Sequence, residues 1–249
     1  MQCPSLLEAE TVDWQQAPCS LASDELHVWS WDTNQFAATN ECLSWLDAAE
    51  QQWHNQLATT ALKQRYAGAH LGMRRVLASY LQVAPQQVAY HISQLGKPSL
   101  PGSELHFNLS HTSSQVLLAV SKSNVGIDCE QLREVTTRDS LASKHFTTEE
   151  LAAYHQSPAT EAVRYFFQTW TRKEAIVKLT GLGLTARVEQ LNTQAGEQSV
   201  NTVAIPPTWN TSHSAVVLMD LTSPSHLAAS LAVEQQPAQV RCYRMTDLG

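Results

Sequence analysis

The sequence lacks the features that mark disulfide-rich, zinc-binding and membrane proteins. Its five cysteines are odd in number and widely separated, and no Cys-x-x-Cys pair occurs, so neither a disulfide framework nor a zinc knuckle is predicted. No apolar run approaches the length of a membrane-spanning helix, and the amino terminus has no basic segment followed by an apolar one. We therefore expect a cytoplasmic protein that does not associate with membranes.

Acidic residues are missing from one long stretch of an otherwise acidic chain. The formal net charge of the 249 residues is −7, which argues against a general nucleic-acid binder, because such proteins are normally basic. No aspartate or glutamate lies between Glu50 and Glu104. Five basic residues lie there: Lys63, Arg65, Arg74, Arg75 and Lys97. This contrast predicts a local anion site rather than a surface for a polyanion.

No low-complexity linker divides the chain, and its hydrophobic content of 43% is that of an ordinary globular protein. Helices are predicted over 41–56, 60–81 and 160–180 from apolar periodicity. Strands are predicted over 26–31, 88–92, 105–111, 116–120, 125–130, 200–205, 215–219, 226–233 and 240–244. The strands at 116–120 and 125–130 are close enough to form a hairpin-like pair. Because the order strand, helices, strands occurs twice, we predict an α/β (α+β) fold with two similar lobes, 1–120 and 121–249, each a small mixed sheet packed on helices.

The strand predicted at 125–130 has two chemically different faces. Its odd-numbered residues are apolar, and its even-numbered residues are Gly126, Asp128 and Glu130. Two carboxylates on one face are costly unless a cation or a hydrogen-bond donor compensates them, and carboxylate oxygens are ligands that Mg²⁺ prefers. This segment alone is consistent with a magnesium site and equally with a solvent-facing strand end.

Two further glutamates occupy informative positions on predicted helices. Glu174 lies in the apolar stripe of the helix at 160–180, where a carboxylate is either paired or functional, and Lys178 follows it at i+4 as a suitable partner. Glu150 stands three residues after Thr147, which is the spacing of a capping box at the start of another helix.

These motifs, in this order, resemble the 4′-phosphopantetheinyl transferases, in particular the large monomeric type that activates nonribosomal peptide and polyketide synthases. The matching segments are Gly96-Lys97-Pro98, residues 107–111 (FNLSH), 126–130 (GIDCE), 170–178 (WTRKEAIVK) and 181–184 (GLGL). They fall within about 65–184, nearly half of the chain. Thr112-Ser113-Ser114 follows the histidine where that family usually has a small Ser-Gly turn.

The resemblance implies two lobes related by a pseudo-twofold axis, with coenzyme A in the cleft between them. The first lobe would contact the nucleotide and its 3′-phosphate, and the second would carry the metal site and the catalytic helix. The implied reaction transfers the 4′-phosphopantetheine group of coenzyme A to a serine of an apo acyl or peptidyl carrier protein and releases 3′,5′-ADP. It would serve fatty acid, polyketide or nonribosomal peptide biosynthesis, and the enzyme would be a monomer.

The resemblance also assigns the metal and catalytic residues. Asp128, Glu130 and Glu174 would hold Mg²⁺, or Mn²⁺ in its place, against the pyrophosphate of coenzyme A. Glu174, directly or through a metal-bound water, is the first candidate for the general base that takes the serine proton, and Glu150 is the second. Lys178 would stabilise charge on the leaving or bridging oxygen.

Coenzyme A contacts are implied for six residues: Arg65, Arg74, Lys97, Ser110, His111 and Lys178. The first three match positions around the nucleotide and its 3′-phosphate, Ser110 would lie beside the adenosine, and the last two would contact the phosphates. Arg65 and Arg74 are nine residues apart, about half a turn out of phase on a straight helix, so they need not share a face. Solvated helical arginines are the alternative interpretation.

A non-catalytic module of the same fold that binds coenzyme A or a carrier protein is the main alternative function. The intact carboxylates and Lys178 weigh against it. Another Mg²⁺-dependent phosphate-transfer enzyme has no support, because no Walker-type phosphate loop is present. The segment 133–146, which contains Arg133, Arg138 and Lys144, is our expectation for the carrier-binding surface.

Overall fold

Most strands and helices form close to their predicted positions. The structure, a computed structural model, describes residues 3–14, 17–36, 39–193 and 200–248. Its helices are α1 (Asn40–Leu43), α2 (Ala48–Gln56), α3 (Thr60–Leu81), α4 (Arg138–His145), α5 (Thr148–Gln156) and α6 (Ala162–Thr180). Its strands are β1 (Glu10–Thr11), β2 (Glu25–Asp32), β3 (His91–Ile92), β4 (Pro98–Ser99), β5 (His106–Thr112), β6 (Gln115–Ser121), β7 (Val125–Gln131), β8 (Val200–Ala204), β9 (Ala215–Asp220), β10 (Leu227–Val233) and β11 (Gln239–Arg244). The predicted α+β class is therefore confirmed.

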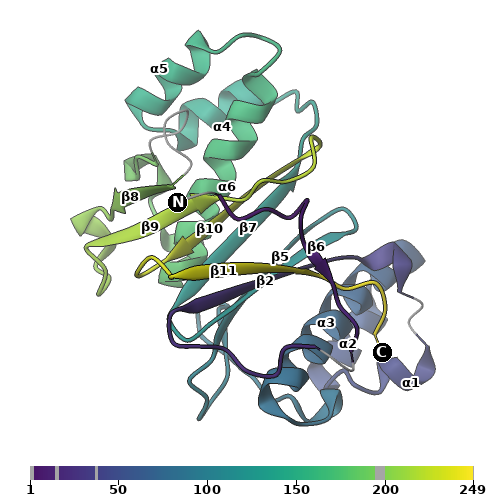
Figure 1. Ribbon diagram of the computed structural model, residues 1–249. Coiled ribbons are helices and arrows are strands. Elements are labelled where there is room, and N and C mark those ends of the chain that lie inside the picture. Colours follow the sequence, from purple (N-terminus) through teal and green to yellow (C-terminus); the bar gives the residue numbers. More distant parts are fainter. Residues whose placement is uncertain (1–2, 15–16, 37–38, 194–199, 249) are drawn as a thin grey trace.

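The first sheet has five strands in the order β1-β11-β2-β6-β5. Helix α3 covers one face of it, and Gly72 lets the helix approach the sheet, because a Cβ there would lie 2.6 Å from the indole ring of Trp31. Trp29, Trp31 and Phe107 are buried in the core between α3 and this sheet. Helices α1 and α2 lie on the same side as α3 (Figure 1).

The second sheet has four strands in the order β7-β10-β9-β8, and α6 packs on its outer face. The apolar residues of β7, including Ile127 and Cys129, point the other way and join a buried cluster with Val28 of β2 and Leu117 of β6. The two sheets thus share one core. Helix α3 lies outside the first sheet, and α4 to α6 lie on the side of the second sheet (Figure 1). The predicted two-faced character of the strand at 125–130 is confirmed.

Strands β5 and β7 join the two sheets through side chains. The backbone nitrogens of Ile127, Cys129 and Gln131 donate hydrogen bonds to side chains of β5 at 2.8, 3.3 and 3.2 Å. The acceptors are Asn108, Ser110 and Thr112, in that order. The constant offset of 19 residues means that the two strands run parallel. Polar side chains on alternate positions of β5 therefore satisfy the open edge of β7.

One prediction about strand pairing and two about the extent of single elements were wrong. The strands at 116–120 and 125–130 do not pair, because β2 and β5 already occupy both edges of β6, and β7 pairs with β10 instead. The helix expected at 41–56 is two helices, since the side chain of Asp47 caps α2. The strand expected at 88–92 shrinks to β3, which pairs with β4.

The division at residue 120 does not follow the sheets at the carboxyl end. Strand β11, from the second predicted lobe, lies between β1 and β2 and completes the first sheet.

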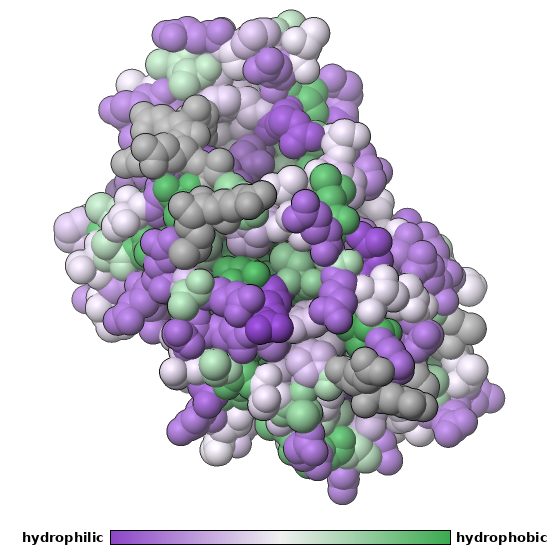
Figure 2. All heavy atoms as spheres, in the orientation of Figure 1, coloured by the Kyte–Doolittle hydropathy of each residue, from purple (hydrophilic) through white to green (hydrophobic). Residues whose placement is uncertain are grey.

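Among the described residues, no helix is both long and apolar enough to cross a membrane. On the face that Figure 2 shows, apolar side chains lie in small separate patches among hydrophilic ones.

Candidate active site at the junction of the two sheets

Helix α6 packs directly on β7 because Gly126 has no side chain. A Cβ at this position would lie 2.0 Å from the carbonyl oxygen of Ala175 and 2.4 Å from the backbone nitrogen of Leu179. These distances are far shorter than van der Waals contact, so a larger residue would push the helix off the strand. The close approach brings polar side chains of α6 to the even-numbered residues of β7.

Asp128 is the centre of this junction. Its side chain is buried, and its Oδ1 accepts hydrogen bonds from Nζ of Lys178 and from Oγ of Ser110, both at 2.7 Å. Ser110 also accepts the bond from the nitrogen of Cys129 described above. The serine and the lysine therefore hold one carboxylate from two different elements, β5 and α6.

The other two predicted metal ligands flank Asp128. Glu130 is half-buried, and its Oε2 accepts hydrogen bonds from Thr112 at 3.3 Å and from Arg133 at 3.0 Å. Burial raises the pKa of Glu174, and the nearby carboxylates of Asp128 and Glu130 raise it further, although Lys178 opposes the rise. Among the residues that the structure describes, no hydrogen bond or close ion pair to the Glu174 carboxylate is present.

This donor set fits a hard divalent cation. Three carboxylates share one corner, where the charges of Asp128 and Glu130 add to burial in raising the pKa of Glu174 and Lys178 opposes them. Within the described ranges, no three histidine, cysteine, aspartate or glutamate side chains are already arranged to hold a metal ion. The assignment of Asp128, Glu130 and Glu174 to a metal site therefore stays a prediction.

Several basic side chains lie around His111 of β5. His111 is exposed, and its pKa is lowered first by partial burial and then by the nearby charges of Lys178, His70 and Arg65. Arg65 is exposed on α3. The structure thus places Arg65 and Lys178 near enough to His111 to act on its pKa. It adds His70, which the sequence reasoning missed although this histidine lies in the acid-free stretch.

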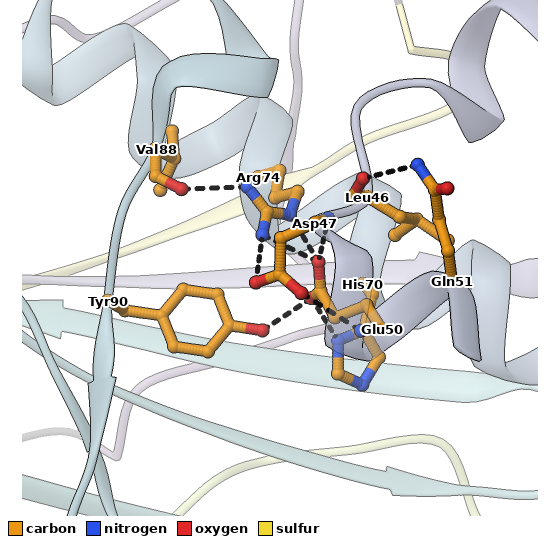
Figure 3. Close-up of polar contacts among 8 residues, drawn as sticks. All are labelled: Leu46, Asp47, Glu50, Gln51, His70, Arg74, Val88 and Tyr90. Carbon is orange, nitrogen blue, oxygen red and sulfur yellow. Dashed lines mark hydrogen bonds and ion pairs between the residues drawn. The ribbon is translucent and has the colours of Figure 1, made fainter. Parts of the chain in front are cut away.

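Arg74 does not join this group, which corrects the predicted contact with the nucleotide. Only 1% of its surface is exposed. Its Nε donates to Glu50 at 2.7 Å, its Nη1 to the carbonyl oxygen of Val88 at 2.7 Å, and its Nη2 to Asp47 at 3.0 Å (Figure 3). Because these partners occupy the guanidinium inside the protein, Arg74 cannot reach a ligand in the cleft without leaving the buried carboxylate of Glu50 unpaired.

Glu150 is also engaged elsewhere, so its proposed role as a second general base is corrected. It forms the predicted capping box with Thr147, and it pairs with Nζ of Lys173 at 2.7 Å while only 2% exposed. Its other oxygen accepts hydrogen bonds from the backbone nitrogen of Thr193 at 2.8 Å and from the Thr193 hydroxyl at 2.7 Å. Lys173 in turn donates to the carbonyl oxygens of Val188 and Leu191. This buried pair therefore anchors the segment 188–193 to α6.

Lys97 connects the β3–β4 hairpin to the end of α6. Its Nζ donates to Asn124 at 2.6 Å and to the carbonyl oxygen of Leu179 at 2.7 Å, and burial lowers its pKa to about 8. Lys97 also lines a pocket of about 860 Å³ whose wall contains Glu174 and Lys178. A second pocket of about 540 Å³ shares the Lys97 wall. The space beside the carboxylates is thus large enough for a cofactor-sized ligand.

Comparison with known proteins identifies the family. Residues 124–231 match the 4′-phosphopantetheinyl transferase superfamily. The 4′-phosphopantetheinyl transferase HetI of Nostoc sp. is 30% identical over 220 residues, which cover 86% of this chain and 90% of HetI. Psf-1 of Bacillus pumilus is 29% identical over 137 residues, 54% of this chain and 57% of psf-1. Sfp of Bacillus subtilis is 24% identical over 135 residues, 54% of this chain and 59% of Sfp. The last two matches therefore span little more than half of either chain.

The chain belongs to the 4′-phosphopantetheinyl transferase superfamily and is an Sfp-like member of it. It is accordingly a transferase. The predicted family and enzyme class are confirmed, whereas the roles of the individual site residues stay predictions.

Proposed function

We propose that this enzyme transfers the 4′-phosphopantetheine group of coenzyme A to a serine hydroxyl of an apo acyl or peptidyl carrier protein, with Mg²⁺ or Mn²⁺, and releases 3′,5′-ADP. The observation that carries the proposal is that Asp128, which pairs with Lys178 at 2.7 Å, and Glu130 both lie near enough to Glu174 to raise its pKa. A family match alone would allow a binding module, but a module would not need three clustered carboxylates.

Coenzyme A would lie between the two proposed lobes. Arg65 and His111 belong to the first sheet and its helix, and the carboxylates belong to the second sheet and its helix. Arg65 and His111 would contact the phosphates of the nucleotide, and the carboxylates would hold the metal ion against the pyrophosphate. We extend the proposal to the pseudo-twofold relation of the lobes, to a monomeric state and to the cytoplasm.

The reaction forms one bond and breaks one bond at phosphorus. The serine oxygen attacks the β-phosphorus, which carries pantetheine, and the bond from this phosphorus to the bridging oxygen breaks, so that 3′,5′-ADP leaves with the electron pair. Mg²⁺, when bound by the three carboxylates, supplies charge neutralisation on the phosphates. Glu174 accepts the serine proton, a role that a raised pKa favours, because a stronger base takes the proton more readily. Lys178 donates to the leaving oxygen.

The first test is a transfer assay with purified protein, apo carrier proteins, coenzyme A and Mg²⁺. Intact-mass measurement should show the addition of one phosphopantetheine group to the carrier, and chromatography should show an equal amount of 3′,5′-ADP. A carrier whose acceptor serine is replaced by alanine is the control. Coenzyme A binding without mass gain on any of several carriers would overturn the proposal in favour of the binding module.

Carrier docking is proposed for the segment 133–146. Carrier proteins are acidic around the acceptor serine, and Lys144 is exposed on α4 while Arg133 lies beside Glu130 of the candidate site. Lys144→Glu should therefore raise the KM for the carrier by a larger factor than the KM for coenzyme A. If the KM for the carrier is the same in the unaltered protein and in the Lys144→Glu variant, the carrier docks elsewhere.

A further inference from the structure

Lys97, in the turn between β3 and β4, has an acceptor for each of the three hydrogens of its ammonium group. Its Nζ lies 2.6 Å from Oδ1 of Asn124, 2.7 Å from the carbonyl oxygen of Leu179 and 3.5 Å from that of Val125. Burial lowers its pKa to about 8, so most of the protein carries the charged form at neutral pH. A lysine ammonium has three donors and no acceptor. A phosphate could therefore bind this group only by displacing one of these oxygens.

The three oxygens belong to the two elements that carry the candidate site. Leu179 directly follows Lys178 in the last turn of α6, where carbonyl groups lack partners within the helix. Val125 is the first residue of β7, three residues before Asp128. Asn124 precedes this strand and donates from Nδ2 to the carbonyl oxygen of Leu179 at 3.1 Å. One ammonium group from the predicted first lobe thus ties the end of α6 to the start of β7.

The backbone around Lys97 packs on the turn that ends α6. Gly181 is in the left-handed region with a φ of +71°, and a Cβ there would lie 3.3 Å from Cδ of Lys97. A Cβ at Gly183 would lie 3.1 Å from the carbonyl oxygen of Leu95. The two glycines therefore leave room for the turn that contains Lys97. The segments 96–98 and 181–184, which are separate motifs in the sequence, form the two sides of one contact.

We propose that Lys97 is a positioning residue for the transfer reaction, which locks the end of α6 against the start of β7 and so holds Nζ of Lys178 at the carboxylate of Asp128. The inference rests on the proposed function, because it assigns a role within the same site. A cation at the carboxyl end of a helix is favourable, since the helix dipole is negative there. Without Lys97 the last turn loses its charged donor, and any shift of this turn moves Lys178 directly. This role differs from the predicted contact of Lys97 with the nucleotide.

The first measurement separates catalysis from nucleotide binding. Lys97→Met keeps an apolar stem of similar length and removes the three donors. It should lower kcat in the transfer assay by about 10-fold to 100-fold, because a shift of about 1 Å at a reacting group has an effect of this order. The affinity for 3′,5′-ADP, measured by titration calorimetry, should fall by a much smaller factor. A loss of this affinity as large as the loss of kcat would place Lys97 on the nucleotide and overturn the inference.

The second measurement needs no enzymatic activity. Backbone hydrogen exchange, followed by mass spectrometry, reports how readily the last turn of α6 opens. Lys97→Met should speed exchange in peptides that cover 177–184. Asn124→Ala removes one acceptor of Lys97 and one donor to Leu179, so it should speed the same exchange to a lesser extent. Because both side chains hold one carbonyl oxygen, their effects on kcat should be less than additive in the double variant.

Lys122→Met is the matched control, because Lys122 is exposed in the turn between β6 and β7 and pairs with Glu104 at 3.8 Å. It should change neither kcat nor the exchange of 177–184. If Lys97→Met does not fold, Asn124→Ala carries the same comparison. Exchange in 177–184 that equals that of the unaltered protein in both variants would overturn the inference. Faster exchange in a protein that modifies no carrier would uphold the lock and count against the proposed function alone.

Discussion

Gly126 lies so close to Ala175 that a Cβ on the glycine would stand 2.0 Å from the alanine carbonyl oxygen. This contact lets α6 rest on β7, and it thereby sets the distance between the carboxylate of Asp128 on the strand and the ammonium group of Lys178 on the helix. The glycine of the Gly-x-Asp-x-Glu motif thus serves the geometry of the site as much as the two acids do.

Replacement of Gly126 by alanine should lower the free energy of unfolding by at least about 2 kcal/mol and reduce transfer by the remaining folded protein, because the helix must move off the strand. Gly102→Ala is the control, since its φ of +72° strains any other residue but no atom lies within 4 Å of the new Cβ. It should cost about 1 kcal/mol without loss of transfer. Urea unfolding measures the free energy of unfolding of the two variants, and the transfer assay measures their activity. Equal behaviour of the two variants would show that the contact with α6 is unimportant.

Ser110→Ala removes the hydroxyl that donates to Asp128 and accepts from Cys129. Because such supporting hydrogen bonds orient a metal ligand, we expect the Mg²⁺ concentration for half-maximal transfer to rise by about 10-fold or more. Ser113→Ala is the control, since this exposed serine bonds only to the side chain of Gln131 among the described residues. The expectation fails if Ser110→Ala instead raises only the KM for coenzyme A, which would favour the predicted contact with adenosine.

Glu150 and Glu174 should respond in opposite ways to replacement by glutamine. Glu150→Gln breaks a buried pair with Lys173, so it should cost about 3–5 kcal/mol of unfolding free energy, while the folded fraction keeps its activity. Glu174→Gln should lower transfer by more than about 100-fold with little change in stability. Calorimetric unfolding and single-turnover transfer distinguish the two. A fully active Glu174→Gln protein would contradict its role as base and metal ligand.

The ion pair at Glu50 should make stability depend on pH in a defined window. The pKa of Glu50 is about 2 in the folded protein, below its ordinary value of 4.5, so the stabilisation is complete above about pH 4.5 and is lost as the pH falls toward 2. Glu50→Gln should therefore lower the unfolding free energy by about 3 kcal/mol at pH 7, and by clearly less at pH 3. Urea unfolding at both values measures this. A difference that is constant between pH 7 and pH 3 would refute the assignment.

Several elements of the fold and site could be predicted because their signals are local. The bounds of α3 agree with the predicted 60–81, and Thr147 and Glu150 form the capping box that their spacing indicated. Alternation along β7 predicted an apolar and a carboxylate face, and both are present. The ordered motifs were sufficient for the family and the enzyme class, which the similarity to HetI confirms.

Only the tertiary structure decided which polar groups meet. Arg74 looked like a free cation in the sequence, but the fold places it on Glu50, 24 residues earlier. The fold likewise brings the hydroxyl of Ser110 to Asp128 instead of leaving it open to the cleft. It also returns β11 to the first sheet, a pairing that the order of the elements along the chain does not indicate. Periodicity and spacing report only which way a side chain points from its own helix or strand. The partner of a buried charge depends on how distant elements pack, and that packing follows from the burial of apolar surface by the whole chain.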